Sequence, residues 1–333
     1  MFDKIFIEEE ALNHPKTLSF LKKFPSVKTK TIDSIDQVFG KVRKPYLQKR
    51  HNLNAFLGFK KGQLIKEAPP AYGLAGEPHY YFIHQYNCIY ECDYCYLQGY
   101  FNSPDLVFFL NHEEVGNEIK KAANKNPERC SWFHAGEFSD SLALSHLTGE
   151  LPYYFELFKQ LPQAKLEFRT KSANITELLK LPPLKNVITS FSLSPEKRIQ
   201  SSDLKTPPLK HRLLAIQKLH QAGHPIAIHF DPIIYSQGFE EQYCQLIEQL
   251  ISYLPASAIQ YISVGVVRFP KDIFHQVKRN YPKSDLHSSE LIKSDNGLIR
   301  YPRPMRRWIL SKVKELLLQA GVAESGIYLC MED

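Results

Sequence analysis

Three cysteines stand close together in the first third of the chain, in the spacing C-x3-C-x2-C. They are Cys88, Cys92 and Cys95, within the stretch Gln85-Tyr-Asn-Cys-Ile-Tyr-Glu-Cys-Asp-Tyr-Cys-Tyr-Leu-Gln98. Three thiolates can bind three irons of a [4Fe–4S] cube and leave the fourth iron open to a small molecule, whereas a cluster held by four cysteines only passes electrons. The spacing therefore predicts a [4Fe–4S] cluster with these three cysteines as ligands.

Two other interpretations of these cysteines stay open at this point. A structural zinc site needs a fourth ligand and usually shows two close cysteine pairs or a following histidine pair. No second pair follows here. The Cys92–Cys95 pair alone matches a thioredoxin-like redox motif, which leaves Cys88 without a role. The alternatives to a cluster enzyme are therefore a non-enzymatic zinc or cluster protein that binds nucleic acid, and a redox protein.

Composition indicates a globular protein of a reducing compartment. The chain has 333 residues, of which 43% are hydrophobic and 12% aromatic, enough for one large core with a small addition. Acidic residues follow the first apolar residues too soon for a signal peptide, and no apolar run has the length of a membrane span. Six cysteines, three of them clustered, fit a metal site better than a disulfide framework. We expect a cytoplasmic protein without a membrane partner.

The net charge of +7 is concentrated near the N-terminus. Residues 1–70 hold 14 Lys/Arg and 7 Asp/Glu, whereas the rest of the chain holds 28 of each. Such a segment can contact a polyanion, and nucleic-acid phosphate is the usual one. A solvated lysine-rich surface explains the charge equally simply, and on charge alone it is the better explanation. The densest basic stretch comprises Lys41, Arg43, Lys44, Lys49 and Arg50.

Strand and helix patterns alternate after residue 77. We expect a basic appendage over residues 1–77, ending in a Pro/Gly-rich stretch, and a second unit over residues 78–333. Repeated strand-then-helix units predict a parallel sheet with right-handed crossovers, and about six units suffice for a partial barrel. The expected strands are Tyr80–Gln85, Ser131–His134, Lys165–Thr170, Val187–Ser192, Pro225–Phe230 and Ile259–Val267. The expected helices are His112–Lys125, Leu151–Leu161, Asn174–Lys180, Pro208–Ala222, Phe239–Tyr253 and Pro302–Ala320.

Polar side chains follow several of these strands at the edge where catalytic groups gather. The cysteine loop follows the first strand, and Gly136-Glu137 follows the second. Lys171 follows the third strand, where it either contacts a cofactor or is an ordinary surface lysine. Ser192 ends the fourth strand, where a hydroxyl suits a ribose or a turn.

The order of these motifs resembles the spore photoproduct lyase family of radical SAM proteins. The most specific part is Cys92-Asp-Tyr-Cys-Tyr-Leu-Gln98, and the resemblance extends from about Lys61 to the C-terminus. It implies an α/β fold, a partial (β/α)6 radical SAM barrel with a small N-terminal α/β appendage. It also implies a [4Fe–4S] cluster, S-adenosyl-L-methionine as cofactor, DNA as a partner through the basic N-terminal segment, and an electron donor such as flavodoxin or ferredoxin.

The resemblance also assigns roles to individual residues. By position, Glu137, Ser139, Lys171 and Ser192 match cofactor-binding residues. In radical SAM enzymes the glutamate after the second strand holds the amino group of the methionine moiety, through a charge-assisted hydrogen bond.

One position departs from the family and bears on the reaction. Tyr94 and Tyr96 match tyrosines that relay a hydrogen atom, but Glu137 stands where the family carries its hydrogen-donating cysteine. A carboxylic acid cannot replace a thiol in that role, because its O–H bond is far stronger. Cys330 is a candidate replacement donor, or a small buried hydrophobic residue. The expected function is hydrogen-atom abstraction, with damaged DNA as the candidate substrate.

Overall fold

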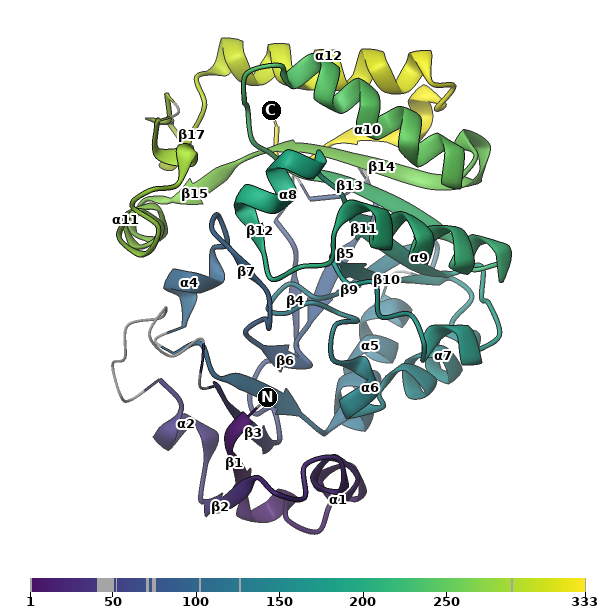
Figure 1. The fold of residues 1–333 in the computed structure, drawn as a ribbon. Helices are drawn as coiled ribbons and strands as arrows, with labels where there is room; N and C mark the ends of the chain where they lie inside the picture. The colour runs from purple at the N-terminus through teal and green to yellow at the C-terminus, as the bar shows by residue number, and fades with distance from the viewer. Residues whose placement is uncertain are drawn as a thin grey trace.

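Two large sheets organise the computed structural model, which describes residues 2–40, 51, 53–69, 72–73, 76–101, 103–125, 127–288 and 290–332 (Figure 1). The larger sheet comprises β4 (Ile65–Glu67), β5 (His79–Phe82), β9 (Ser131–Ala135), β10 (Ala164–Thr170), β11 (Val187–Ser192), β13 (Ile226–Ile233), β14 (Ile259–Val266) and β18 (Ile327–Leu329). Its order is β18-β14-β13-β11-β10-β9-β5-β4, and every pair is parallel except β4–β5. This sheet curls into a half-barrel, as the alternating pattern predicted.

Helices between these strands cover the outside of the half-barrel (Figure 1). They are α5 (His112–Lys125), α7 (Leu151–Lys159), α9 (Leu209–Gln221), α10 (Phe239–Tyr253) and α12 (Arg303–Gln319). The other helices are α4 (Leu97–Tyr100), α6 (Ser145–Thr148), α8 (Glu196–Ser202) and α11 (Lys271–Asn280). Two small sheets pair β7 (Glu91–Cys92) with β12 (Asp203–Leu204), and join β15 (Arg268–Pro270), β16 (Ile292–Lys293) and β17 (Leu298–Arg300).

The N-terminal residues form a second sheet that draws strands from the later chain. Its order is β2-β1-β3-β8-β6. The members are β1 (Phe2–Glu8), β2 (Lys28–Ile32), β3 (Leu53–Gly58), β6 (Gln85–Tyr86) and β8 (Leu106–Phe109), with helices α1 (Pro15–Lys22) and α2 (Ile35–Val38) beside them. Because β6 and β8 follow residue 78, this sheet is completed from beyond the predicted boundary, which itself stays a prediction.

Most expected elements are confirmed, and two are wrong. The expected strand over residues 80–85 is two strands, because the chain leaves β5 after Phe82 and re-pairs at Gln85 with β8 of the other sheet. The expected helix over residues 174–180 is only a 3-10 turn, Leu178–Lys180. Asn174 instead donates its side-chain N–H groups to the carbonyls of Leu142 and Ala143, at 3.2 and 3.3 Å. Asparagine side chains compete with helix formation in this way.

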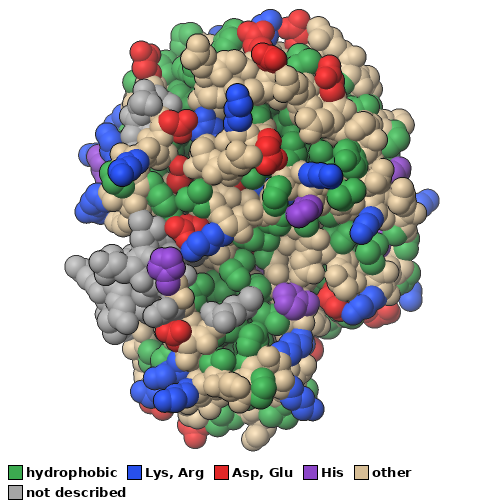
Figure 2. Space-filling view, viewed as in Figure 1, with side chains coloured by type: hydrophobic (Ala, Val, Ile, Leu, Met, Phe, Trp, Pro, Cys, Tyr) green, Lys and Arg blue, Asp and Glu red, His purple; other side chains and the backbone are tan. Residues whose placement is uncertain are grey.

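Aromatic side chains fill the space between the half-barrel and its helices. Phe133, Phe168, Phe191 and Phe230 on β9, β10, β11 and β13 are all at most 1% exposed. Burying such a side chain contributes roughly 1.5–3 kcal/mol, so the strands are anchored from their outer faces. Figure 2 shows charged side chains scattered over one face, with hydrophobic side chains between them near its centre. Within the described ranges, every helix is too short or too polar to span a lipid bilayer.

Candidate active site

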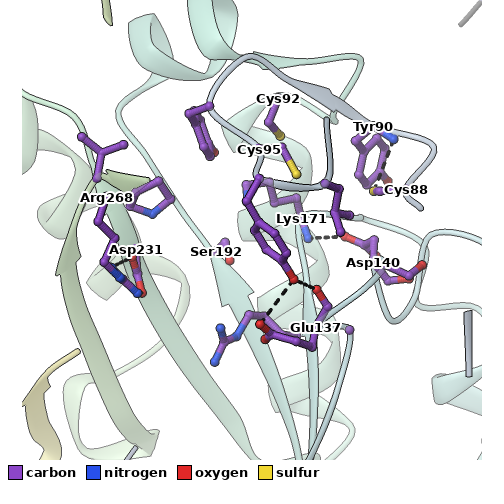
Figure 3. A pocket seen from close by; sticks show the side chains of 18 of the residues that line it. Cys88, Tyr90, Cys92, Cys95, Glu137, Asp140, Lys171, Ser192, Asp231 and Arg268 are labelled. Atoms are coloured by element: carbon purple, nitrogen blue, oxygen red, sulfur yellow. Dashed lines mark hydrogen bonds and ion pairs between the residues drawn. The ribbon is translucent and has the colours of Figure 1, made fainter. Parts of the chain in front are cut away.

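One pocket opens at the carboxyl ends of the parallel strands, and it has two chemically different walls (Figure 3). We call residues 88–97, which carry the three cysteines, the cysteine wall. We call Arg169, Asp231 and Arg268, from the ends of β10, β13 and β15, the arginine wall. Polar side chains that follow or end β9, β10 and β11 complete the lining: Glu137, Ser139, Asp140, Lys171 and Ser192.

The cysteine wall is positioned by a segment more than a hundred residues away. Strand β7 pairs with β12, so that Cys92 lies opposite Asp203. The Tyr94 hydroxyl donates to the Asp203 carboxylate, which also accepts from the Arg212 guanidinium at 3.0 Å. Arg212 is fully buried and donates to the Ser192 carbonyl at 2.9 Å. One buried ion pair thus connects the cysteine loop to the end of β11.

The donor set of this wall fits an iron–sulfur cluster. The reduced thiols of Cys88, Cys92 and Cys95 line the same pocket. Burial raises the pKa of the Cys92 thiol well above its usual value, so its thiolate form requires a nearby cation. Among the described residues, no three histidine, cysteine or carboxylate side chains converge on a single metal ion. A [4Fe–4S] cube has a different requirement, because each thiolate binds its own iron.

Glu137 reaches the pocket because Gly136 allows a sharp turn after β9. Gly136 has φ of 99°, and a Cβ there would lie 2.4 Å from Ser141 Oγ and 3.1 Å from the Arg169 carbonyl oxygen. Only glycine fits such a position. The Tyr96 hydroxyl donates to the Glu137 carbonyl and lies 3.3 Å from its carboxylate oxygen Oε1. The cysteine wall and the end of β9 therefore meet at this tyrosine.

Asp140 joins the ends of β9 and β10 into one unit. Its carboxylate accepts the backbone N–H of Lys171 and the hydroxyl of Thr170, both at 2.7 Å, and the backbone N–H of Leu142 at 3.0 Å (Figure 3). With its backbone held in this way, the Lys171 side chain extends toward the cysteine wall, where its ammonium lies 5.6 Å from the centre of the Tyr94 ring. A lysine in this place can pair with an anionic cofactor group.

The arginine wall holds its charges in pairs. The Arg268 guanidinium donates two hydrogen bonds to Asp231, at 3.0 and 3.1 Å, and a third to the Val266 carbonyl. Burial opposes ionisation of Asp231, but Arg268 lowers the pKa of this carboxyl to about 2. Cys330 lies behind this pair, with its sulfur 3.6 Å from Arg268 and 1% of its surface exposed. Burial raises the pKa of the Cys330 thiol to about 12.

The structure brings nine of the ten predicted site residues to this pocket. Those lining it are Cys88, Cys92, Cys95, Tyr94, Tyr96, Glu137, Ser139, Lys171 and Ser192. Cys330 does not line the pocket, although the next residue, Met331, does. Their individual roles stay predictions.

Sequence reasoning missed Arg169 and Arg268 as pocket residues. Arg169 precedes Lys171 by two positions, so strand alternation could have placed both on one face. No sequence signal identifies Arg268, because β15 is only three residues long.

Comparison with known proteins identifies the family. The chain matches the sequence profile of the family described as "Spore photoproduct lyase" over residues 1–304. It is 28% identical to the spore photoproduct lyase of Bacillus subtilis (strain 168) and 24% identical to that of Geobacillus sp. (strain Y412MC61). Each comparison spans 293 residues, 86% of this chain and 84% of the relative.

Solved structures agree with this assignment at the level of the fold. One is a mutant of spore photoproduct lyase with bound AdoMet and dinucleoside spore photoproduct, and another is spore photoproduct lyase complexed with dinucleoside spore photoproduct. Each superposes with a TM-score of 0.85 at 22% identity, over 99% of this chain and 98% of the other. The expected radical SAM half-barrel is thereby confirmed. With a profile match across nine-tenths of its length, a matching half-barrel and three cysteines at its open edge, the chain belongs to the spore photoproduct lyase family.

Proposed function

We propose that this protein is a radical SAM enzyme that takes a hydrogen atom from a damaged DNA base. One observation carries the proposal: a single pocket collects three cysteines from one loop and polar side chains from three neighbouring strand ends. Membership of the family supports it, as do the solved relatives with bound AdoMet and dinucleoside spore photoproduct.

Cys88, Cys92 and Cys95 would hold the [4Fe–4S] cluster. When bound, the cluster supplies the electron that cleaves S-adenosylmethionine to a 5′-deoxyadenosyl radical. The cysteine wall braces these ligands through β7 and β12 and limits the access of water, because Cys92 is only 8% exposed.

Four polar side chains would bind the cofactor. The Glu137 carboxylate accepts hydrogen bonds from its amino group, and Lys171 pairs with its carboxylate or contacts its ribose. Ser139 and Ser192 offer hydroxyls to the remaining polar groups. Ser139 already donates to the side-chain oxygen of Gln85 at 2.6 Å, so its oxygen is held in place as an acceptor.

Two residues compete for the role of hydrogen donor, because Glu137 occupies the position of the family's cysteine. Tyr96 is the better placed of the two, since it lines the pocket and its hydroxyl contacts Glu137. Cys330 lies behind Arg268 and needs a movement of that side chain to reach the substrate. In this scheme Tyr94 and Tyr96 relay a hydrogen atom between the substrate and 5′-deoxyadenosine.

The expected partners of this protein are DNA and an electron donor. The predicted DNA-binding stretch, Lys41 to Arg50, lies outside the described residues, so this role stays a prediction. An electron donor such as flavodoxin or ferredoxin and a cytoplasmic location accompany the proposal as predictions. A single-ion zinc site is not favoured, because the described residues hold no suitable group of three ligands.

An anaerobic turnover experiment tests the function. Reconstituted, reduced protein should contain about four irons per chain and cleave S-adenosylmethionine to 5′-deoxyadenosine and methionine, slowly even without substrate. With DNA that carries the spore thymine lesion, restored thymine is the product to look for. A Cys92→Ala variant should be inactive, with Cys244→Ala as the matched control. One zinc per chain and no cleavage would contradict the proposal.

A further inference from the structure

Arg169 brings to the pocket a positive charge whose hydrogen-bond donors are only partly used by the protein. It lies at the end of β10, lines the pocket, and leaves 24% of its side chain exposed. It forms an ion pair with Glu167, where the Nη2–Oε2 distance of 3.5 Å is at the limit for a hydrogen bond. Its Nε atom is buried without a hydrogen-bond partner in the structure. The guanidinium therefore has a counter-charge nearby, yet it retains donors for something else.

Glu167 offers Arg169 only its Oε2 atom, at the long distance of 3.5 Å, and this oxygen already accepts from His134 Nδ1, while Oε1 accepts from three other side chains. This carboxylate is fully buried and accepts hydrogen bonds from four other side chains. They are His134 Nδ1, Ser190 Oγ at 2.5 Å, His229 Nε2 at 2.7 Å and the Tyr261 hydroxyl at 2.7 Å. A carboxylate offers about four acceptor sites. Burial opposes its ionisation, but Arg169, His134 and His229 hold the pKa of Glu167 well below its usual range.

Arg268, the other arginine of the arginine wall, directs its hydrogen bonds to acceptors within the protein. Arg268 makes two hydrogen bonds to Asp231 and one to the Val266 carbonyl. Arg169 is instead steadied through its face, since the guanidinium carbon lies 5.4 Å from the centre of the Tyr72 ring. A cation held by an aromatic face keeps its in-plane N–H groups available. Of these two arginines, Arg169 is the one prepared to bind a ligand.

We propose that Arg169 is a specificity-determining residue that donates hydrogen bonds to an acceptor oxygen of a nucleotide substrate. The assignment rests on the proposed function, which supplies the class of substrate. Two nucleotide groups carry such oxygens, the base carbonyls and the phosphodiester. The nearby charge of Glu167 means that Arg169 needs no anion for balance, so a neutral base carbonyl is the favoured acceptor.

Two probes separate these acceptors: a lesion dinucleotide, which contains the phosphodiester, and a dinucleoside lesion, which lacks it. Their dissociation constants are measured with the cluster-loaded full-length protein and with Arg169→Gln and Arg169→Lys variants. Arg307→Gln, an exposed arginine on α12, is the matched control. Loss of hydrogen bonds to a charged donor predicts roughly 10- to 100-fold weaker binding by Arg169→Gln. Arg169→Lys keeps the charge but not the planar fork, and should recover only part of the affinity.

The pattern across the probes decides the outcome. Weaker binding of both probes assigns Arg169 to the base carbonyl, and weaker binding of the dinucleotide alone assigns it to the phosphodiester. If both Arg169 variants bind both probes within about twofold of the unmodified protein, the inference is overturned. If the unmodified protein cleaves S-adenosylmethionine but binds neither probe, the nucleotide substrate itself is wrong, and this role of Arg169 is refuted with it. Thermal unfolding identifies a misfolded Arg169→Gln protein, in which case Arg169→Lys decides.

Discussion

The two walls of the pocket are built on opposite electrostatic principles. In the arginine wall, Asp231 is buried, but Arg268 lowers the pKa of its carboxyl to about 2. In the cysteine wall, burial raises the pKa of Cys92 well above its usual value and raises the pKa of Asp93 to about 6, against the hydrogen bonds from Ser284 and Ser202. The charges of the Asp231–Arg268 pair therefore stabilise each other, whereas the Cys92 thiol of the cysteine wall stays neutral until a cation binds nearby.

This difference indicates how the site divides its tasks. A wall with paired charges keeps one geometry with or without ligand, which suits substrate orientation. A buried thiol such as that of Cys92 gains its charge only together with a metal cluster, so cluster binding and deprotonation of this thiol are coupled. The same pocket thus combines a permanent recognition surface with a surface that depends on its cofactor.

The largest expected effect follows from removing a thiol of the cysteine wall. Replacement of Cys88, Cys92 or Cys95 by Ala, one at a time, should abolish the visible cluster absorbance and most iron binding, because each thiolate serves a different iron. Iron content per chain is the measurement. Ala variants of the three other cysteines, Cys130, Cys244 and Cys330, should keep the cluster. Full iron retention in any variant of the first three would refute the ligand assignment.

A second change removes the support behind the cysteine wall. Arg212→Leu leaves Asp203 buried without its counter-charge, which should lower the free energy of unfolding by roughly 3–5 kcal/mol. Urea denaturation measures the change. Lys210→Leu, at an exposed position on the same helix, is the matched control and should cost less than about 0.5 kcal/mol. Equal stability of the two variants would mean that the pair does not brace the loop.

A third change tests the polar side chain that follows β9. Glu137→Gln keeps the shape of the side chain but removes its charge, so the affinity for S-adenosylmethionine should fall by roughly 1.5–3 kcal/mol. Equilibrium binding to the cluster-loaded protein measures the effect, and Glu128→Gln, at an exposed site, serves as control. Unchanged affinity would assign Glu137 another role.

The smallest expected effect is a change of stability with pH that depends on the Asp231–Arg268 pair. Because Arg268 lowers the pKa of Asp231 to about 2, the stability from this carboxylate is present above its unfolded pKa, near 4, and is lost as pH falls toward 2. The stability difference between the unmodified protein and Asp231→Asn should therefore shrink by roughly 2 kcal/mol across that window. Chemical denaturation at several pH values follows it. A difference independent of pH would show that Asp231 is not held ionised by Arg268.

The sequence by itself identified the residues of the cysteine wall and most of the half-barrel. Cys88, Cys92 and Cys95 lie within eight residues, so their spacing alone limits the groups they can bind. Strands such as β11 and helices such as α10 have the predicted bounds, because hydrophobic periodicity is a local property. The position of Glu137 just after β9 likewise follows from the sequence, because the expected second strand ends shortly before it.

Only the tertiary structure decided how these pieces face one another. The bend at residues 83–84 sends β6 into the other sheet, and its partner β8 lies some twenty residues further along the chain. The Asp203–Arg212 ion pair supports the cysteine loop because Asp203 also accepts a hydrogen bond from Tyr94. The four donors to Glu167 come from four different strands. Whether an arginine at a strand end is saturated, like Arg268, or still has donors available, like Arg169, depends on distant acceptors and on competing donors. Asp231 lies 37 residues before Arg268, and Tyr261, which donates to Glu167, lies 94 residues after that carboxylate. Spacing along the chain carries no record of such acceptors, because long-range packing alone brings them within hydrogen-bonding distance.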